Sequence, residues 1–267
     1  MSFKDYLIVS DIDGTLLNAP NPIPLRNLQA LREFTNHGGR FALATGRSVD
    51  SAGQYVCQLP VNAPCILFNG AGIYDYTKQR LLVAQYLPDH FREYVRVILE
   101  RFPSIGAQLH DPETMYIVSD PYYVKKYLVV ENIEFVQMEL EALSQKFLKL
   151  VLVMDPEMVE DVDKFVHMQH WEDVSFCRSG PYYVEMLPLG TNKGSALRQL
   201  AQLLNHPISQ VVAIGDFYND LQMLQAAGIS ATVAEAPEDI KQLCNVVTGS
   251  FENGALADLI TYLKQRG

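Results

Sequence analysis

Short apolar segments alternate with helical patterns at both ends of this chain, and this rhythm constrains the fold more than any other feature. Near the start, the pattern predicts strands at 6–10, 40–44 and 65–68 and helices at 24–36 and 49–58. Later it predicts helices at 193–204 and 220–227, strands at 211–214 and 230–233, and a closing helix near 254–264. Apolar strands separated by helices of this length are typical of a parallel sheet with right-handed crossovers.

The middle of the chain breaks this rhythm. A hairpin is predicted over 71–87, and strands are predicted among helices at 115–118, 148–154, 174–178 and 182–186. This mixture favours an α+β insertion of roughly 100 residues, a size that suits a separate domain. The predicted fold class is therefore α/β: a Rossmann-like parallel-sheet core with helices on both faces, formed by residues 1–82 and 188–267, plus an inserted α+β domain at 83–187.

The composition is that of an ordinary globular protein. The 267 residues are 48% hydrophobic and 19% charged, and the net charge of −10 would repel a nucleic-acid backbone. The four cysteines are scattered without a Cys-x-x-Cys pair, which disfavours a disulfide or zinc framework. The first apolar run is too short for a signal peptide or a membrane span. We therefore expect a cytoplasmic protein with no nucleic acid and no membrane as partner.

Two aspartates follow the first predicted strand. Asp11 and Asp13 come directly after the apolar run at 6–10, on the same side by the period-two geometry of a strand, and Gly14 permits a sharp turn. Carboxylates at a strand end suit magnesium-assisted phosphoryl transfer, because hard oxygen ligands hold Mg²⁺ and a carboxylate can attack phosphorus. A plain turn with solvated aspartates is the structural alternative. A calcium-binding EF-hand does not fit, since Pro22 stands where its bidentate glutamate belongs.

Further polar residues fall at the ends of other predicted strands. Thr45 and Gly46 follow the second strand, where a hydroxyl and helix amides can hold a phosphate oxygen. Lys193 opens a helix, a place that disfavours a cation unless an anion binds there. Asp216 and Asp220 follow a late strand, at the edge where open α/β sheets bind ligands. Each residue alone has an ordinary structural explanation, but together they predict one phosphate site.

With these segments in place, the chain resembles the haloacid dehalogenase-like hydrolases, and among them the Cof-type phosphatases with a C2B-type cap domain. The matching segments, in order, are DIDGTLL (11–17), ATGR (44–47), FNGA (68–71), GTNKGSAL (190–197) and GDFYNDLQML (215–224). The resemblance covers essentially the whole chain. It implies that the insertion at 83–187 is a cap that closes over the active site, excludes water and determines substrate specificity.

The resemblance also implies a role for each matching residue. Asp11 would be the nucleophile and Asp13 the general acid/base. Phosphate would be bound by Thr45, Gly46, Lys193 and Asn219, and Mg²⁺ by Asp11, Asp13, Asp216 and Asp220. Arg47 and Asn69 would lie at the edge of the pocket. Mg²⁺ and the lysine would offset the repulsion between an anionic nucleophile and an anionic phosphate.

Three residues of the insertion are candidate contacts of a leaving group. Along the strand at 182–186, alternation places Tyr183 and Glu185 on the face opposite to the apolar side chains. Arg178 and His110 are expected near that polar face. An ordinary surface or packing role is the structural alternative for Arg178, Tyr183 and His110 alike.

The expected function is hydrolysis of small phosphorylated metabolites, such as sugar phosphates or phosphorylated cofactors, through an aspartyl-phosphate intermediate. The enzyme would be a phosphoric monoester hydrolase with Mg²⁺ as cofactor and a small-molecule phosphomonoester as its partner. Two alternatives stay open: a phosphosugar mutase, and a non-catalytic phospho-accepting signalling module with the same residue types on a doubly wound sheet. The sequence names neither the physiological substrate nor the oligomeric state.

Overall fold

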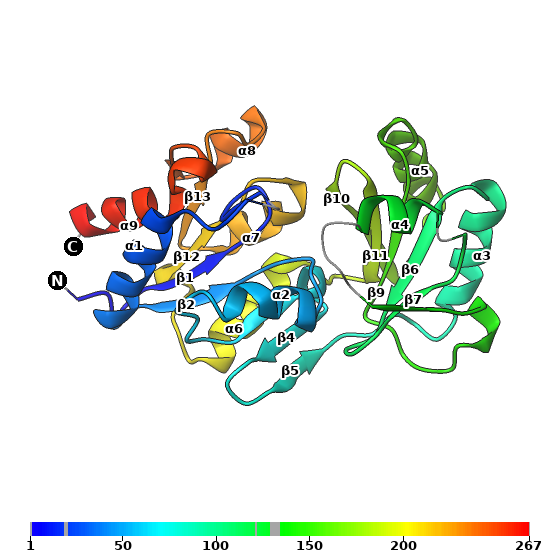
Figure 1. Ribbon diagram of the computed structural model, residues 1–267, viewed down its shortest axis with the longest axis horizontal. Coiled ribbons are helices and arrows are strands. Elements are labelled where there is room, and N and C mark those ends of the chain that lie inside the picture. The colour runs from blue at the N-terminus through cyan, green and yellow to red at the C-terminus, as the bar shows by residue number, and fades with distance from the viewer. Residues whose placement is uncertain (1, 19–20, 121, 129–133, 267) are drawn as a thin grey trace. The chain divides into compact units, whose positions relative to one another are not determined.

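The structure is a computed structural model that describes residues 2–18, 21–120, 122–128 and 134–266. The chain divides into two compact units. The core unit consists of residues 1–82 and 192–267, and the insert unit consists of residues 83–191. Figure 1 shows the helices and strands of each unit.

A parallel sheet forms the centre of the core unit. Its strands among the described residues, in spatial order, are β14 (Val246–Val247), β13 (Ile229–Thr232), β12 (Val211–Ile214), β1 (Leu7–Ser10) and β2 (Arg40–Leu43). The first strand pairs on both sides, with Leu7 opposite Val211 on one side and opposite Arg40 on the other. All of its side chains are buried, which explains why this strand is a continuous apolar run rather than an alternating one.

Helices cover both faces of this sheet. The described helices of the core unit are α1 (Leu25–Asn36), α2 (Val49–Val56), α6 (Lys193–Leu203), α7 (Leu221–Ala226), α8 (Glu238–Leu243) and α9 (Ala255–Arg266). Helix α1 packs against α9, and α6 packs against α7. From β1 the chain passes through α1 to β2 on one side, whereas from β12 it passes through α7 to β13 on the other side. Right-handed crossovers therefore place α1 and α7 on opposite faces of the sheet.

A small antiparallel sheet adjoins the edge of the parallel one. It consists of β3 (Cys65–Leu67), β4 (Gly72–Asp75) and β5 (Arg80–Ala84). A bridge between Ala44 and Ile66 links β3 to the chain that leaves β2. Short 3₁₀ turns of the core unit are η1 (Phe68–Gly70), η3 (Ile208–Gln210), η4 (Tyr218–Asp220) and η5 (Phe251–Asn253). The first of these turns leads directly out of β3.

A second sheet forms the insert unit. Its described strands, in spatial order, are β10 (Val174–Gly180), β11 (Tyr183–Pro188), β9 (Lys149–Val153), β6 (Gly106–His110), β7 (Met115–Ile117) and β8 (Phe135–Gln137). Neighbours run antiparallel, except that β7 and β8 run parallel. Its helical segments are α3 (Phe91–Arg101), α4 (Tyr122–Leu128), η2 (Leu140–Ala142) and α5 (Pro156–Met168).

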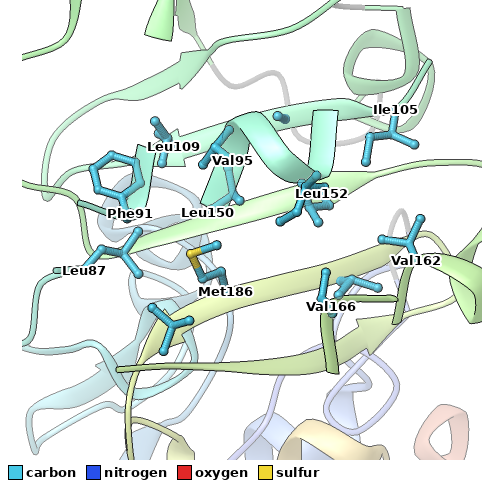
Figure 2. Close-up of a cluster of buried hydrophobic side chains, with 14 of the residues drawn as sticks. Leu87, Phe91, Val95, Ile105, Leu109, Leu150, Leu152, Val162, Val166 and Met186 are labelled. Atoms are coloured by element: carbon cyan, nitrogen blue, oxygen red, sulfur yellow. The ribbon is translucent and has the colours of Figure 1, made fainter. Parts of the chain in front are cut away.

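One face of this sheet carries the hydrophobic core of the insert unit (Figure 2). Alternate residues of β9 and β11, among them Leu150, Leu152 and Met186, belong to this core. Val95 of α3 and Val162 of α5 pack against them from the helices. Because side chains alternate along a strand, the residues between them lie on the opposite face.

The opposite face is mixed in character. Val124 of α4 packs there with Val151 and Val153 of β9 in a smaller hydrophobic cluster. On the same face, Lys149 and Glu185 form a buried ion pair, with 2.8 Å between Nζ and Oε2. The sheet of the insert unit therefore has one face that carries the hydrophobic core and one face that combines apolar residues with buried charge.

The predicted α/β class with a parallel-sheet core is confirmed, and the predicted core elements begin and end within two residues of the observed ones. Helix α8 and strand β14 escape prediction because six and two residues are too few to show a periodic pattern. The insert unit spans residues 83–191 by its internal contacts, and its last strand, β11, ends at Pro188.

Candidate active site

The carboxyl ends of the parallel strands bring several predicted residues together. Asp11 follows β1, Thr45 follows β2 and Asp216 follows β12. Gly14 has a φ of +86°, and a Cβ at this position would overlap the carboxylate of Asp216. Thr15 donates a 2.8 Å hydrogen bond from Oγ1 to Oδ1 of Asp216. Glycine at position 14 thus lets the loop after β1 close onto the loop after β12.

Lys193 lies at the centre of the charged groups. Its side chain is fully buried, and Nζ lies 2.6 Å from Oδ1 of Asp11 and 2.6 Å from Oδ1 of Asp220. Burial lowers the pKa of Lys193, but the two carboxylates raise it by more, so the lysine is cationic. The N-terminal end of α6 disfavours a cation, and the two ion pairs offset that effect.

Asn192 fixes the start of the helix that carries this lysine. Its side chain accepts a 2.8 Å hydrogen bond from the backbone N–H of Ser195, and the hydroxyl of Ser195 accepts one of 3.1 Å from the backbone N–H of Asn192. This reciprocal capping box defines the first turn of α6. Lys193 is therefore held at one position by local sequence as well as by its ion pairs.

Asp11, Asp216 and Asp220 form an acidic cluster beside Lys193. Each offers a carboxylate oxygen, and these oxygens lie within 4.8 Å of one another. Burial raises the pKa of Asp11 well above its ordinary value, and the neighbouring carboxylates add to the rise while Lys193 opposes it. Burial and the charge of Asp220 raise the pKa of Asp216 to about 7, against the lowering effect of the hydrogen bond from Thr15. An oxygen-only set of crowded carboxylates suits a hard divalent cation.

Asp13 does not join this cluster, although it was predicted as a metal ligand. Its carboxylate is about half exposed and pairs with Arg47 through two hydrogen bonds of 2.7 Å, from Nε to Oδ2 and from Nη2 to Oδ1. The guanidinium of Arg47 also donates a 2.7 Å hydrogen bond to Oγ of Ser51 and lies 5.0 Å from the ring centre of Tyr55. A planar guanidinium held on three sides fixes the orientation of the Asp13 carboxylate.

The predicted phosphate-binding loops are joined by direct contacts. Asn219 donates a 3.1 Å hydrogen bond from Nδ2 to Oδ1 of Asn69, and the backbone N–H of Asn69 donates to the carbonyl of Thr45 at 3.0 Å. Gly46 lies against the side chain of Asn69, since a Cβ at position 46 would be 3.0 Å from Nδ2. The structure thus brings Thr45, Gly46, Asn69 and Asn219 together.

His110 and Glu185 lie on the mixed face of the insert unit. His110 pairs in register with Lys149, whose Nζ bonds to Oε2 of Glu185 at 2.8 Å. Ser179 donates a 2.5 Å hydrogen bond to the other carboxylate oxygen of Glu185. Burial lowers the pKa of His110 well below its ordinary value, and the charge of Lys149 lowers it further. This histidine is therefore neutral at physiological pH.

Arg178 and Tyr183 depart from the predicted arrangement. Arg178 lies opposite Val184 in the register of β10 and β11, and so on the face that carries the hydrophobic core, rather than beside Glu185. Tyr183 lies on the Glu185 face, but packs against the smaller hydrophobic cluster. The expectation that Arg178 lies near the polar face is wrong, because the ladder pairs Arg178 with Val184 before its register shifts at Gly180.

Two residues of these sites are missing from the sequence predictions. Thr15, which bonds to Asp216, could have been found as the hydroxyl next to the glycine turn of the first motif. Lys149, which is buried at 3% exposure, stands alone among apolar residues in the predicted strand at 148–154. A single charge inside an apolar strand indicates a buried partner, which here is Glu185.

Comparison with known proteins agrees with this geometry. The family model of the haloacid dehalogenase-like hydrolases matches residues 8–260. The chain belongs to this family. Phosphatase YwpJ of Bacillus subtilis is 28% identical over 295 residues, with 96% of this chain and 99% of the relative covered. The 5-amino-6-(5-phospho-D-ribitylamino)uracil phosphatase YitU of the same organism is 25% identical, with 96% and 97% covered.

The solved structures support the same assignment. A haloacid dehalogenase-like hydrolase from Bacteroides thetaiotaomicron is 25% identical, with a TM-score of 0.83 and with 97% of this chain and 100% of the other covered. Both of these Bacillus subtilis relatives are named phosphatases, which confirms the predicted enzyme class, a phosphoric monoester hydrolase. Among its described residues, no helix has the length and apolar character needed to cross a membrane.

Proposed function

We propose that this hydrolase is a Mg²⁺-dependent phosphatase that cleaves small phosphomonoesters through an aspartyl-phosphate on Asp11. The observation that carries the proposal is the position of Lys193, which bonds at once to Asp11 and to Asp220 next to Asp216. This arrangement puts a buried cation and three carboxylates at one strand-end site. A phosphate beside Asp11 would meet both a nucleophile and the charges that offset its own.

Asp11 would supply the nucleophilic oxygen. Lys193 donates a hydrogen bond to Oδ1 of this carboxylate, so Oδ2 is the atom proposed to attack phosphorus. Lys193, Thr45, Gly46 and Asn219 are proposed to bind the phosphoryl oxygens. Mg²⁺ would be held by Asp11, Asp216 and Asp220, and when bound it would neutralise charge on the phosphate and on the cluster.

Asp13 is proposed as the general acid/base. It would give a proton to the leaving oxygen and then take a proton from the water that cleaves the aspartyl-phosphate. Its exposed carboxylate, oriented by Arg47, supports a role at the mouth of the site rather than inside the acidic cluster. Positioning of this kind supplies much of the rate enhancement in phosphoryl transfer.

The reaction is tested by phosphate release and by trapping of the intermediate. With Mg²⁺ and a panel of phosphomonoesters, the wild type should release inorganic phosphate. When the reaction is quenched with acid during turnover, mass spectrometry should find the peptide that contains Asp11 heavier by the mass of one phosphoryl group. The Asp11→Asn variant is the matched control, because it keeps the shape of the side chain and removes the nucleophile. Transfer of the phosphoryl group to a second hydroxyl of the substrate, without release of phosphate, would instead identify a phosphosugar mutase. A phosphorylated peptide without turnover would identify a phospho-accepting module.

The insert unit is proposed to determine substrate preference, because the core loops are already assigned to phosphate, metal and chemistry. Exchange of residues 83–191 with the insert of a relative of different preference should change the order of kcat/KM among substrates. The need for Asp11 and for Mg²⁺ should stay the same. A folded chimera with the parental order would place specificity in the core unit. The predictions of a cytoplasmic protein without a nucleic-acid or membrane partner stay predictions.

A further inference from the structure

We infer that Asn69 is a substrate-binding residue whose amide Nδ2 donates a hydrogen bond to an oxygen of the substrate's phosphoryl group. This inference rests on the proposed phosphatase function. It goes beyond an assignment to the pocket edge, because it names the donor atom and the part of the substrate that accepts.

The first observation is a buried donor without a partner. Asn69 is 1% exposed, yet its Nδ2 has no hydrogen-bond partner among the residues that the structure describes. Buried polar groups are paired in the great majority of native structures, and an unpaired one costs about 1–3 kcal/mol. A donor left unpaired beside a proposed phosphate site is ready for an anionic acceptor.

The second observation is the backbone conformation. Phe68 and Asn69 both have a φ of 53°, and Gly70 follows with a φ of 102°. Left-handed backbone is uncommon for residues other than glycine, and each such residue costs on the order of 1–3 kcal/mol. Two backbone hydrogen bonds hold the turn, from Phe68 N–H to the carbonyl of Arg47 at 3.1 Å and from Asn69 N–H to that of Thr45 at 3.0 Å. Strain kept in this way typically marks a site where one side chain must be presented in a fixed direction.

The third observation is the orientation of the amide. Asn219 donates to Oδ1 of Asn69 at 3.1 Å, so the carbonyl end of the Asn69 amide points to the loop after β12. The Nδ2 end lies against Gly46, where a Cβ would be 3.0 Å away. Gly70 in turn lies against the backbone of Asn192, directly before Lys193. The free donor is therefore placed among the loops that carry the proposed phosphate ligands.

A purely structural role explains only half of this side chain. If Asn69 served only to join the loops, the hydrogen bond to Oδ1 from Asn219 would suffice, and the Nδ2 donor would have no use. Aspartate at this position keeps the shape and the Oδ1 acceptor but lacks the donor. Glycine removes the whole side chain and accepts a φ of 53° without strain.

The experiment measures kcat, KM and the inhibition constant of inorganic phosphate for the wild type, Asn69→Asp and Asn69→Gly. Loss of a hydrogen bond to a charged group should weaken phosphate binding by about tenfold or more in both variants. KM should rise by a similar factor for every phosphomonoester, because the phosphoryl group is common to all. Thermal unfolding checks that both variants are folded. Because glycine relieves the backbone strain, the melting temperature of Asn69→Gly should stay close to that of the wild type.

A second measurement uses the wild-type chain alone. The side-chain amide resonance of Asn69, assigned by its loss in N69D, should shift when inorganic phosphate is added with Mg²⁺. The inference would be overturned if the wild type is active and the folded Asn69→Gly variant has the same inhibition constant for phosphate as the wild type. The inference would also be overturned if the rise in KM varies with the leaving group while the inhibition constant of phosphate stays unchanged. A wild type that releases no phosphate from any phosphomonoester would instead overturn the proposed function.

Discussion

Replacement of Asp216 by asparagine should stabilise the metal-free protein while it abolishes activity. Burial and the neighbouring Asp220 raise the pKa of Asp216 from its ordinary value of 3.8 to about 7. Because the folded chain holds this proton more tightly than the unfolded chain, the stability that Asp216 contributes is complete below pH 3.8. It is lost as the pH rises to about 7. Above that pH the ionised carboxylate destabilises the fold.

The magnitude follows from the difference between the two pKa values. At 1.36 kcal/mol per unit, the ionised side chain costs roughly 4 kcal/mol above neutral pH, of which roughly 2–3 kcal/mol develops between pH 5 and pH 8. Asparagine avoids this cost but weakens the hydrogen bond from Thr15, which is worth about 1 kcal/mol. We therefore expect Asp216→Asn to raise the free energy of unfolding by about 2 kcal/mol or more at pH 8 in EDTA.

Thermal unfolding in EDTA at several pH values provides the assay. The melting temperature of Asp216→Asn should exceed that of the wild type by about 5 °C at pH 8, and the difference should shrink toward pH 5. The control is Asp161→Asn, the same chemical change at an exposed position of α5, and its effect on the melting temperature is subtracted at each pH. Addition of Mg²⁺ should stabilise the wild type and leave Asp216→Asn unchanged. A variant less stable than the wild type at pH 8, or a difference independent of pH, would refute the reasoning.

Three further outcomes are expected. EDTA should abolish phosphate release and Mg²⁺ should restore it, whereas Ca²⁺ should substitute poorly because it prefers more ligands at longer distances; full activity in metal-free buffer would contradict the assignment of the acidic cluster. Arg47→Met should leave the carboxylate of Asp13 without its fixed orientation, so kcat should fall about tenfold or more on alkyl phosphates. The fall should be smaller on p-nitrophenyl phosphate, because its leaving group needs no proton, and equal losses of kcat on both substrates would show that Arg47 acts in another way. Lys149→Met should lower the stability of the insert unit by about 3–5 kcal/mol, because it leaves Glu185 buried and unpaired, and the additional change Glu185→Leu should recover part of that loss; a single variant that melts like the wild type would contradict this account.

Sequence patterns predict the core unit well because its strands and its chemistry share the same signals. Buried parallel strands such as β1 are continuous apolar runs, and polar residues directly after them mark the ligand-binding edge of the sheet. The sequence alone therefore places Asp11 and Asp216 at one edge of the sheet. The lysine at the first turn of α6 was the other clear signal, because a cation there requires anionic neighbours.

Other features of the site depend on contacts that the sequence pattern does not contain. Strand β1 ends at Ser10, so the alternation applied to Asp11 and Asp13 does not extend over the turn, and the Asp13 carboxylate pairs with Arg47. The strain at Asn69 arises from hydrogen bonds with another loop, which no local preference reveals. The face on which Arg178 lies is set by the register of the strand ladder rather than by the strand's own residues.

The pairing of β1 with β12 has a consequence for how the chain folds during synthesis. Leu7 must find Val211, and the whole insert unit is made between them. At 5–20 residues per second, the ribosome takes roughly 10–40 s to make the chain from Leu7 to Val211. The insert unit is continuous in sequence, so it can complete its own sheet during this interval, while one edge of β1 stays unpaired. The length of the insert therefore sets the time during which an apolar strand edge is open to aggregation, and a shorter insert would shorten that exposure.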